Sequence, residues 1–295
     1  MELSNQSTLK DLLARHGFTF SKALGQNFII NPGVCPRMAE ACTNGTQPFG
    51  VLEIGPGIGV LTRALSQQAV KVVTIELDRR LLPILSETLS DCPNVTVLWG
   101  DALRMDLAAV IEEHFAGMPV AVCANLPYYI TSPLLMRLLE TRLPLENITV
   151  MVQKEAAARL CARPGERACG AVSAAVQYYS TPEILFSVGR GSFLPMPKVD
   201  SAVIRLTLRS SPPISPKSEA AFFACVKAAF AMRRKTVLNA VSAAFSIEKP
   251  VLSNALLQSK ISPLARAEAL DMDGLCRLSD TVFSLRPEAF GSFSE

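Results

Sequence analysis

Clusters that could bind a metal or build a disulfide framework are scarce in this chain of 295 residues. It contains two histidines, His16 and His114, and none of its eight cysteines forms a Cys-x-x-Cys pair. Structural zinc sites and small disulfide scaffolds both depend on such clusters. The sequence therefore predicts no metal site, and it predicts free, mostly buried thiols of the kind found in a reducing compartment.

Long apolar runs are also lacking. No stretch approaches the roughly 18 uninterrupted apolar residues that a membrane span needs, and the polar first residues lack the apolar segment of a secretory signal. Residues 220–232 are apolar but contain Lys227, so we expect a buried helix there. We therefore expect a cytoplasmic protein with no membrane partner.

The chain also lacks a large excess of charge of either sign. The 29 Lys and Arg residues against 26 Asp and Glu residues give a net charge of +3, and the isoelectric point is near 8.4. A pI above about 9 would indicate nucleic-acid binding by itself, so composition neither requires nor excludes an RNA partner. A hydrophobic content of 49% excludes disorder as the main state.

Strand-like and helix-like segments alternate from about residue 50 onward, which predicts a parallel sheet with helices on both faces. Two late strands follow each other without a full helix between them, which favours an antiparallel pair at the sheet edge. The predicted helices are residues 60–68 and 79–89; the predicted strands are residues 51–54, 70–75, 95–98, 120–124, 148–152, 184–188 and 199–208.

A Pro- and Ser-rich stretch at residues 210–216 is typical of a domain linker. Only helical patterns follow it. We therefore expect an α/β protein with a Rossmann-like sheet domain over residues 1–209, including an N-terminal extension over residues 1–33, and a small all-helical domain over residues 217–295. The helical patterns cover residues 220–232, 236–245, 251–258 and 275–285.

Glycines separate the first predicted strand from the helix that follows it. Gly55, Gly57 and Gly59 let the backbone turn tightly and approach a ligand at a helix N-terminus. Glu76 ends the next strand, where a carboxylate can accept both hydroxyls of a ribose, and Asp101 follows the third strand. These residues predict an adenosine-binding crevice at one sheet edge. The alternative is that both acids only cap the following helices.

A second motif, Asn125-Leu126-Pro127-Tyr128, follows the fourth strand. The N6 amino group of adenine is a poor nucleophile because its lone pair is delocalised into the ring. The Asn125 side-chain carbonyl and a nearby backbone carbonyl can orient that group toward an incoming methyl group, Pro127 stiffens the loop, and Tyr128 can stack on the base. The alternative is ordinary turn chemistry. The glycine loop and both acids in the right order favour the catalytic interpretation.

With these motifs the chain resembles the bacterial small-subunit (16S) ribosomal RNA adenine N6,N6-dimethyltransferases over nearly its whole length. The motifs that carry the resemblance are KALGQNF at residues 22–28, EIGPGIG at 53–59, IELD at 75–78, GDAL at 100–103, NLPYYI at 125–130, VQKE at 152–155, GSFLPMPKVDS at 191–201 and FAMRRKTVLN at 230–239.

The resemblance implies a cofactor and a substrate. The cofactor is S-adenosylmethionine, contacted around Asn27, Ile29, Gly55, Glu76, Asp101 and Asn125, with Gly57 from the glycine loop. The substrate is two adjacent adenosines in a 3′-terminal hairpin loop of 16S rRNA, within a small-subunit (30S) assembly intermediate. The resemblance thus implies an enzyme of ribosome biogenesis, which we expect to act as a monomer.

Two departures from the family pattern stand out. Asn31 follows Ile29 and Ile30 where the family usually has Leu-x-Asp, a conservative change at a cofactor wall. Cys169 replaces a more usual tyrosine, a change that concerns local packing or an RNA contact.

Five basic residues and one aromatic residue are candidates for RNA contacts. We expect Arg233, Arg234 and Lys235 on a C-terminal helix, where a solvated face is the competing explanation. Phe193 lies in a Gly- and Pro-rich loop, where it either stacks on the target base, as we expect of Tyr128, or fills the core. The remaining candidates are Arg190 and Lys198.

Three other functions are alternatives to this one. A 23S rRNA adenine N6-methyltransferase of the macrolide-resistance type shares the Asn-x-Pro-Tyr motif, but the double tyrosine and the Arg-Arg-Lys run favour the small-subunit family. A ribosome-assembly factor with incidental methylation is the second. An NAD-dependent dehydrogenase is the third, and the missing last fingerprint glycine argues against it.

Overall fold

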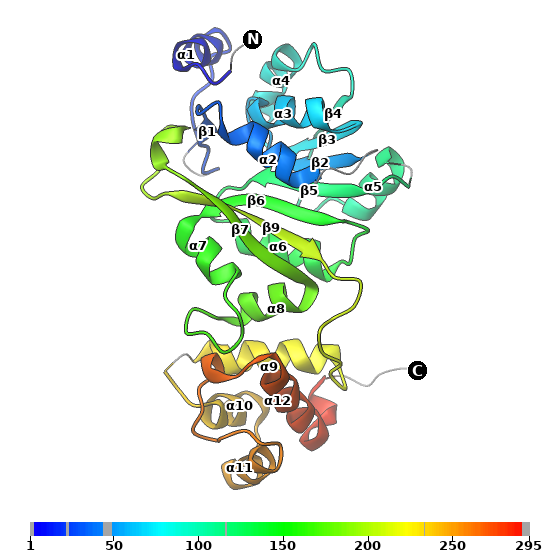
Figure 1. Cartoon of the computed structure of the whole chain (residues 1–295), viewed down its shortest axis with the longest axis vertical. Helices are drawn as coiled ribbons and strands as arrows, with labels where there is room; N and C mark the ends of the chain where they lie inside the picture. The colour runs from blue at the N-terminus through cyan, green and yellow to red at the C-terminus, as the bar shows by residue number, and fades with distance from the viewer. Residues whose placement is uncertain (1–2, 22–23, 44–48, 116, 233, 291–295) are drawn as a thin grey trace. The chain divides into compact units, whose positions relative to one another are not determined.

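The computed structural model describes residues 3–21, 24–43, 49–115, 117–232 and 234–290 (Figure 1). The chain divides into two compact units. The sheet unit comprises Met1–Ala157 and Thr181–Leu208, and the helical unit comprises Ala158–Ser180 and Arg209–Glu295. Among the described residues, no helix is both long and apolar enough to cross a membrane.

A seven-stranded sheet forms the centre of the sheet unit, in the order β4-β3-β2-β5-β6-β9-β7. Five strands, β2 to β6, are parallel, and β9 runs antiparallel to β6. The predicted fold class is thereby confirmed. The strands are β2 (Gly50–Ile54), β3 (Lys71–Glu76), β4 (Val95–Trp99), β5 (Val120–Asn125), β6 (Asn147–Gln153), β7 (Ser180–Val188) and β9 (Ser201–Leu208).

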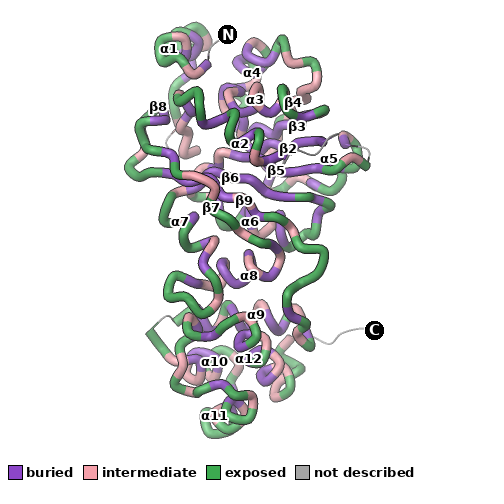
Figure 2. The backbone as a smooth tube through the Cα atoms, in the orientation of Figure 1, coloured by how far each residue is buried: buried purple, intermediate pink, exposed green. Residues whose placement is uncertain are grey.

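Both faces of this sheet are covered. On one face α2 and α3 pack against alternate strand residues such as Val51 and Val72, while Leu52 and Val122 point to the opposite face and are also buried. The inner strands are therefore buried on both faces, as Figure 2 shows. The helices are α1 (Gln6–Arg15), α2 (Val34–Thr43), α3 (Val60–Gln68), η1 (Arg79–Leu81), α4 (Leu82–Thr88), α5 (Leu107–Phe115), α6 (Thr131–Glu140) and α7 (Lys154–Leu160).

The strand order reverses between β2 and β5. From β2 the chain proceeds outward through β3 and β4, and from β5 it proceeds through β6 on the other side. In open parallel sheets such a switch point leaves a crevice at the carboxyl ends of the strands. A two-strand ribbon lies outside this sheet, in which β1 (Phe28–Ile29) pairs antiparallel with β8 (Phe193–Leu194), after the 3₁₀ turn η2 (Arg190–Ser192).

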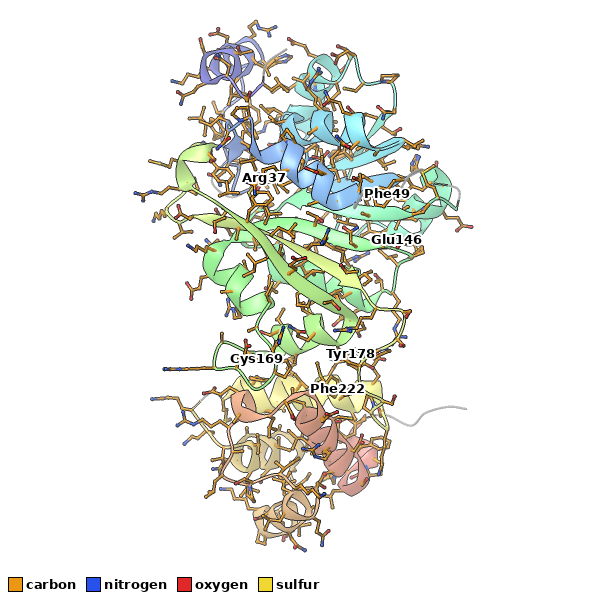
Figure 3. All side chains as sticks on the ribbon, viewed as in Figure 1. Arg37, Phe49, Glu146, Cys169, Tyr178 and Phe222 are labelled. Carbon is orange, nitrogen blue, oxygen red and sulfur yellow. The ribbon has the colours of Figure 1, made fainter. Side chains whose placement is uncertain are left out.

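The helical unit is built around aromatic and aliphatic side chains. Tyr178 stacks on Phe222 with ring centroids 5.3 Å apart (Figure 3), and Tyr179 stacks on Phe223 at 5.4 Å. Glu219 accepts hydrogen bonds from both tyrosine hydroxyls. Its helices are α8 (Ala171–Tyr179), α9 (Glu219–Ala231), α10 (Val237–Phe245), α11 (Lys249–Gln258), η3 (Ala267–Ala269), α12 (Met272–Leu285) and η4 (Pro287–Phe290).

The compact units divide the chain differently from the predicted domains. Residues 158–180, predicted to belong to the sheet domain, pack with the C-terminal helices. Cys169 is fully buried in this helical core, so the departure from the family tyrosine is a matter of packing.

The placement of the basic run on a helix was wrong. Arg234 and Lys235 lie in the turn between α9, which ends at Ala231, and α10, which begins at Val237. The Thr236 side chain accepts the Asn239 N–H as the N-cap of α10, and the Lys235 N–H donates to the Met232 carbonyl. Arg233 lies outside the described residues.

Candidate active site

One cavity of about 220 Å³ opens at the switch point of the sheet unit. Its lining comes from the carboxyl ends of β2, β3 and β5, from the segment after β4 and from residues 24–29. It brings together all the predicted catalytic and cofactor-binding residues: Asn27, Ile29, Gly55, Gly57, Glu76, Asp101, Asn125, Leu126, Pro127 and Tyr128.

The glycine loop forms the floor of this cavity. Gly55, Gly57 and Gly59 have φ values of +74°, +60° and +87°, a region that side chains with a Cβ disfavour. A Cβ at Gly55 would project into open space, and one at Gly57 would meet the ring of Phe28 at 3.0 Å. The loop thus leaves room for a ligand at the N-terminus of α3, the place predicted from the sequence.

Glu76 presents a buried carboxylate at the end of β3. Its Oε1 accepts the Asp78 N–H at 2.7 Å and its Oε2 accepts the Gly57 N–H at 3.2 Å. Burial raises the pKa of Glu76 to about 7, and these two hydrogen bonds act in the opposite direction. Each oxygen retains a second lone pair, so the carboxylate can still accept hydroxyl groups.

Asp101 lies in the loop after β4, and its Oδ1 accepts the Leu103 N–H at 2.9 Å. Arg104 approaches its Oδ2 at 3.5 Å. Asp101 therefore does cap its own turn, yet its side chain also lines the cavity. The capping bond expected by the alternative interpretation is therefore present, and the position of Asp101 at the cavity keeps a binding role open as a proposal.

Asn125 is fixed by its contact with the N-terminal segment. Its Nδ2 donates to the Asn27 carbonyl at 3.3 Å, and the Asn27 Nδ2 in turn donates to the Gly25 carbonyl. The Tyr128 hydroxyl forms a 3.2 Å hydrogen bond with Ser201 Oγ at the start of β9. Both side chains are thus held in place by residues from distant parts of the sequence.

The residues predicted to contact RNA lie partly at the cavity and partly on the surfaces of the two units. Phe193 lines the cavity but is only 4% exposed, within the core under α2. Arg190 and Lys198 are exposed in the sheet unit, and Arg234 and Lys235 are exposed in the helical unit. Within the described residues, no group of three potential ligands could hold a metal ion.

Asn31, the other departure from the family pattern, lies beside the ribbon. Its Nδ2 donates to Ser192 Oγ at 3.1 Å and its Oδ1 accepts the Gly33 N–H at 3.0 Å. An aspartate could accept the second bond, so the change keeps the local turn.

Residues 17–282 match the family model described as ribosomal RNA adenine dimethylase. The chain belongs to this family. It is 45% identical over 288 residues to a protein of Geobacillus thermodenitrificans named ribosomal RNA small subunit methyltransferase A, which spans 96% of this chain and 98% of that relative. A Bacillus mycoides protein of the same name is 44% identical, spanning 95% and 97%.

Two solved structures resemble this dimethylase family member over most of its length. A dimethyladenosine transferase from Plasmodium falciparum has a TM-score of 0.68 at 25% identity and covers 85% of this chain and 95% of that one. The 23S rRNA methyltransferase ErmE has a TM-score of 0.66 at 26% identity, covering 86% and 99%. The predictions of the family and of an enzyme that dimethylates adenine in ribosomal RNA are confirmed.

The sequence motifs missed part of the site. Gln26 and Leu77 also line the cavity, and Asp78 lies behind Glu76 with its carboxylate bonded to Gln26 and Arg80. Gln26 and Asp78 each belong to a quoted motif, but nothing in the sequence indicates that the two residues meet.

Proposed function

We propose that this chain uses S-adenosylmethionine to dimethylate N6 of two adjacent adenosines in the 3′-terminal hairpin loop of 16S rRNA. We further propose that it acts as a cytoplasmic monomer on a 30S assembly intermediate. The observation that carries the proposal is that the glycine loop, Glu76, Asp101, Asn125 and Tyr128 line one cavity.

The residues of the cavity fit this cofactor. Glu76 offers an acceptor to the ribose hydroxyls, and the open space at Gly55 lets a ligand approach the backbone. Leu77, Ala102 and Leu103 add an apolar wall suited to an adenine ring. When bound, S-adenosylmethionine supplies an electrophilic methyl group on its sulfonium.

Asn125 supplies the first acceptor for the target amino group. Because its Nδ2 is committed to the Asn27 carbonyl, its Oδ1 is left to accept a hydrogen from N6. The Pro127 carbonyl already accepts the Ile130 N–H and the Thr131 hydroxyl. The backbone carbonyl of Leu126 is therefore the second acceptor we assign.

Tyr128 would hold the extruded adenine by stacking, since a base inside a duplex cannot present N6 to the cavity. The hydroxyl bond to Ser201 fixes the ring by its edge and leaves its face for the base. The same pocket has to admit a monomethylated adenine for the second transfer.

One further observation favours the small-subunit substrate, and a second supports an RNA partner in general. Relatives named for the small subunit are 42–45% identical to this chain, whereas the 23S enzyme ErmE is 26% identical. The helical unit also carries 14 Lys and Arg residues against nine Asp and Glu residues, which suits a partner with a phosphate backbone.

A single-turnover assay with products resolved by mass tests this proposal. Unmethylated 30S and 50S subunits are compared as substrates for wild type, for Asn125→Ala and for Asn254→Ala, a control at an exposed asparagine on α11. We expect dimethylated adenosine from 30S alone. Asn125→Ala should slow the reaction at least 100-fold with RNA affinity retained, since phosphate contacts dominate binding, and Asn254→Ala should match wild type.

Three results would contradict the proposal. An Asn125→Ala enzyme that dimethylates at the normal rate would exclude the assigned role of this residue. Exclusively monomethylated product from wild type would exclude dimethylation. Methylation of the large subunit alone would favour the 23S alternative.

A further inference from the structure

The wall of the cavity formed by residues 24–29 has little regular structure of its own. One end is fixed by the ribbon, where Phe28 lies opposite Leu194 and the Ile30 N–H donates to the Ser192 carbonyl at 2.8 Å. The rest of the segment is held by side-chain hydrogen bonds. One joins Asn125 to the Asn27 carbonyl, and several others converge on one carboxylate.

That carboxylate is Asp78, two residues beyond the end of β3. Its Oδ2 accepts Gln26 Nε2 at 2.8 Å, and the Gln26 Oε1 accepts the Ser21 N–H at 2.8 Å. Arg80 donates to both oxygens of Asp78, at 2.9 and 2.6 Å, and also to the Thr19 carbonyl at 3.3 Å. Asp78 thus connects three points of the N-terminal segment to the end of β3.

Asp78 also orients the carboxylate that we assign to the ribose, because its N–H donates to Glu76 Oε1 at 2.7 Å. Its own side chain is 6% exposed and lies outside the described lining of the cavity. The Arg80 guanidinium lowers the pKa of Asp78 below its usual value, so the group is ionised at neutral pH. Asp78 therefore acts on the site indirectly, through its backbone N–H to Glu76 and through its side-chain bonds to Gln26 and Arg80.

We propose that Asp78 and Gln26 are positioning residues for the cofactor, and that their hydrogen bond holds the wall of residues 24–29 against the ribose-binding end of β3. This inference rests on the proposed function. It gives a role to two motif residues that the chemistry does not use directly. It also predicts that breaking this hydrogen bond affects cofactor affinity and kcat to different extents.

Removing the bond should weaken cofactor binding and spare the chemical step. Gln26→Ala, and Gln26→Met with a side chain of similar length, should raise the Kd of S-adenosylmethionine about tenfold, as expected for one hydrogen bond to a charged group. At saturating cofactor the wall is held by its ligand, so kcat should stay within about twofold of wild type.

The measurements are titration calorimetry with S-adenosylmethionine alone, turnover at saturating cofactor, and amide hydrogen exchange. In the free Gln26 variants, exchange should quicken over residues 24–30 and slow again on adding cofactor. The matched control is Asp91→Asn, which breaks an Asp–Arg pair with Arg63 on an exposed carboxylate. It should bind S-adenosylmethionine as wild type does.

Asp78→Asn tests the same bond from its other side. If the two residues act through one contact, their effects should not be independent. The fold-loss in affinity of the double variant Gln26→Ala/Asp78→Asn should then be smaller than the product of the two single fold-losses. Strictly independent losses would contradict the inference.

Other outcomes separate the two proposals. If wild type binds S-adenosylmethionine and both Gln26 variants bind it equally well, this inference is wrong and the proposed function stands. If kcat falls together with affinity, or exchange quickens throughout the sheet unit, the role is structural and the inference is also wrong. If wild type does not bind S-adenosylmethionine, the proposed function itself fails.

Discussion

Glu76, to which we assign the ribose hydroxyls, has a pKa that burial raises from 4.5 to about 7. Its folded-state carboxyl therefore takes up a proton as the pH falls through neutrality. The ionised form is the stronger acceptor for ribose hydroxyls, and hydrogen bonds to charged groups contribute about 1.5–3 kcal/mol.

We therefore expect the affinity for S-adenosylmethionine to decrease on going from pH 8 to pH 6, by up to about tenfold per pH unit below pH 7. Glu76→Gln should bind more weakly at pH 8 and show little pH dependence in this range. Titration calorimetry at several pH values measures both. An equally steep profile in the variant would assign the dependence to another group.

The position of the Tyr128 ring depends on a hydrogen bond to Ser201, which lies outside the motif of residues 125–128. Ser201 is 1% exposed, and its hydroxyl meets the Tyr128 hydroxyl at 3.2 Å. Tyr128→Phe and Ser201→Ala should each slow single-turnover methylation by about two- to tenfold, the equivalent of about 0.5–1.5 kcal/mol. Tyr128→Ala should be more severe, because stacking contributes about 1–3 kcal/mol per base.

The double variant Tyr128→Phe/Ser201→Ala distinguishes an anchor from a substrate contact. If the hydroxyl only anchors the ring, the double variant should be no slower than the slower single one. A silent Ser201→Ala beside a slow Tyr128→Phe would indicate instead that the tyrosine hydroxyl contacts the substrate.

Besides Glu76, a second buried carboxyl group lies near the end of β2, two residues before the glycine loop. Glu53 is fully buried, and its Oε2 accepts the Thr62 hydroxyl at 2.6 Å. Burial raises the pKa of Glu53 from 4.5 to about 7. Between these two values the folded state holds a proton that the unfolded state releases, so the free energy of unfolding decreases as the pH rises.

Glu53→Gln stays neutral at every pH and should lack this loss. Between pH 5 and pH 8, we expect wild type to lose about 2.5 kcal/mol more free energy of unfolding than the variant does. Urea denaturation of both proteins at the two pH values measures the difference. Equal losses would mean that the Glu53 carboxyl is already ionised at pH 5.

At the level of elements, the sequence was most informative where a local pattern decides the structure. Residues 60–68 form a helix as predicted, and the inner strands begin and end within about two residues of their apolar runs. The pattern could not say that β9 lies between β6 and β7, or that α8 joins the helical core. Both depend on long-range contacts: the pairing of β9 with β6 in the first case, and the stacking of Tyr178 on Phe222 in the second.

The same limit applies to the site. Strand-end residues such as Glu76 and Asn125 could be predicted because parallel strands bring their carboxyl ends to one edge. The bond between Gln26 and Asp78 joins residues 52 positions apart, and the bond between Tyr128 and Ser201 joins residues 73 apart. No spacing rule links such pairs, so only the folded structure reveals them.

For the whole molecule, the net charge of +3 conceals an uneven distribution. The sheet unit has 15 Lys and Arg residues against 17 Asp and Glu residues, which is −2, while the helical unit has 14 against nine, which is +5. Phosphate contacts release counterions and make binding depend on salt. We therefore expect the helical unit to contribute much of the salt dependence of RNA binding.

Replacing Arg233, Arg234 and Lys235 together with alanine tests where those contacts lie. The two described residues are exposed in the turn after α9. Each lost phosphate contact should flatten the slope of log K against log salt by about 0.7–0.9, so three contacts would flatten it by about 2–3. Filter binding of a small-subunit RNA fragment over a salt series measures the slope, and the affinity for S-adenosylmethionine should not change.

The control variant, Lys249→Ala/Lys260→Ala, removes charge from exposed positions of the same helical unit. If only net charge matters, it should flatten the slope about two-thirds as much as the triple variant does, because it removes two charges instead of three. If the turn after α9 contacts phosphates directly, the control should keep nearly the wild-type slope. A triple variant that retains the wild-type slope would mean that this turn is a solvated surface and that the RNA binds elsewhere.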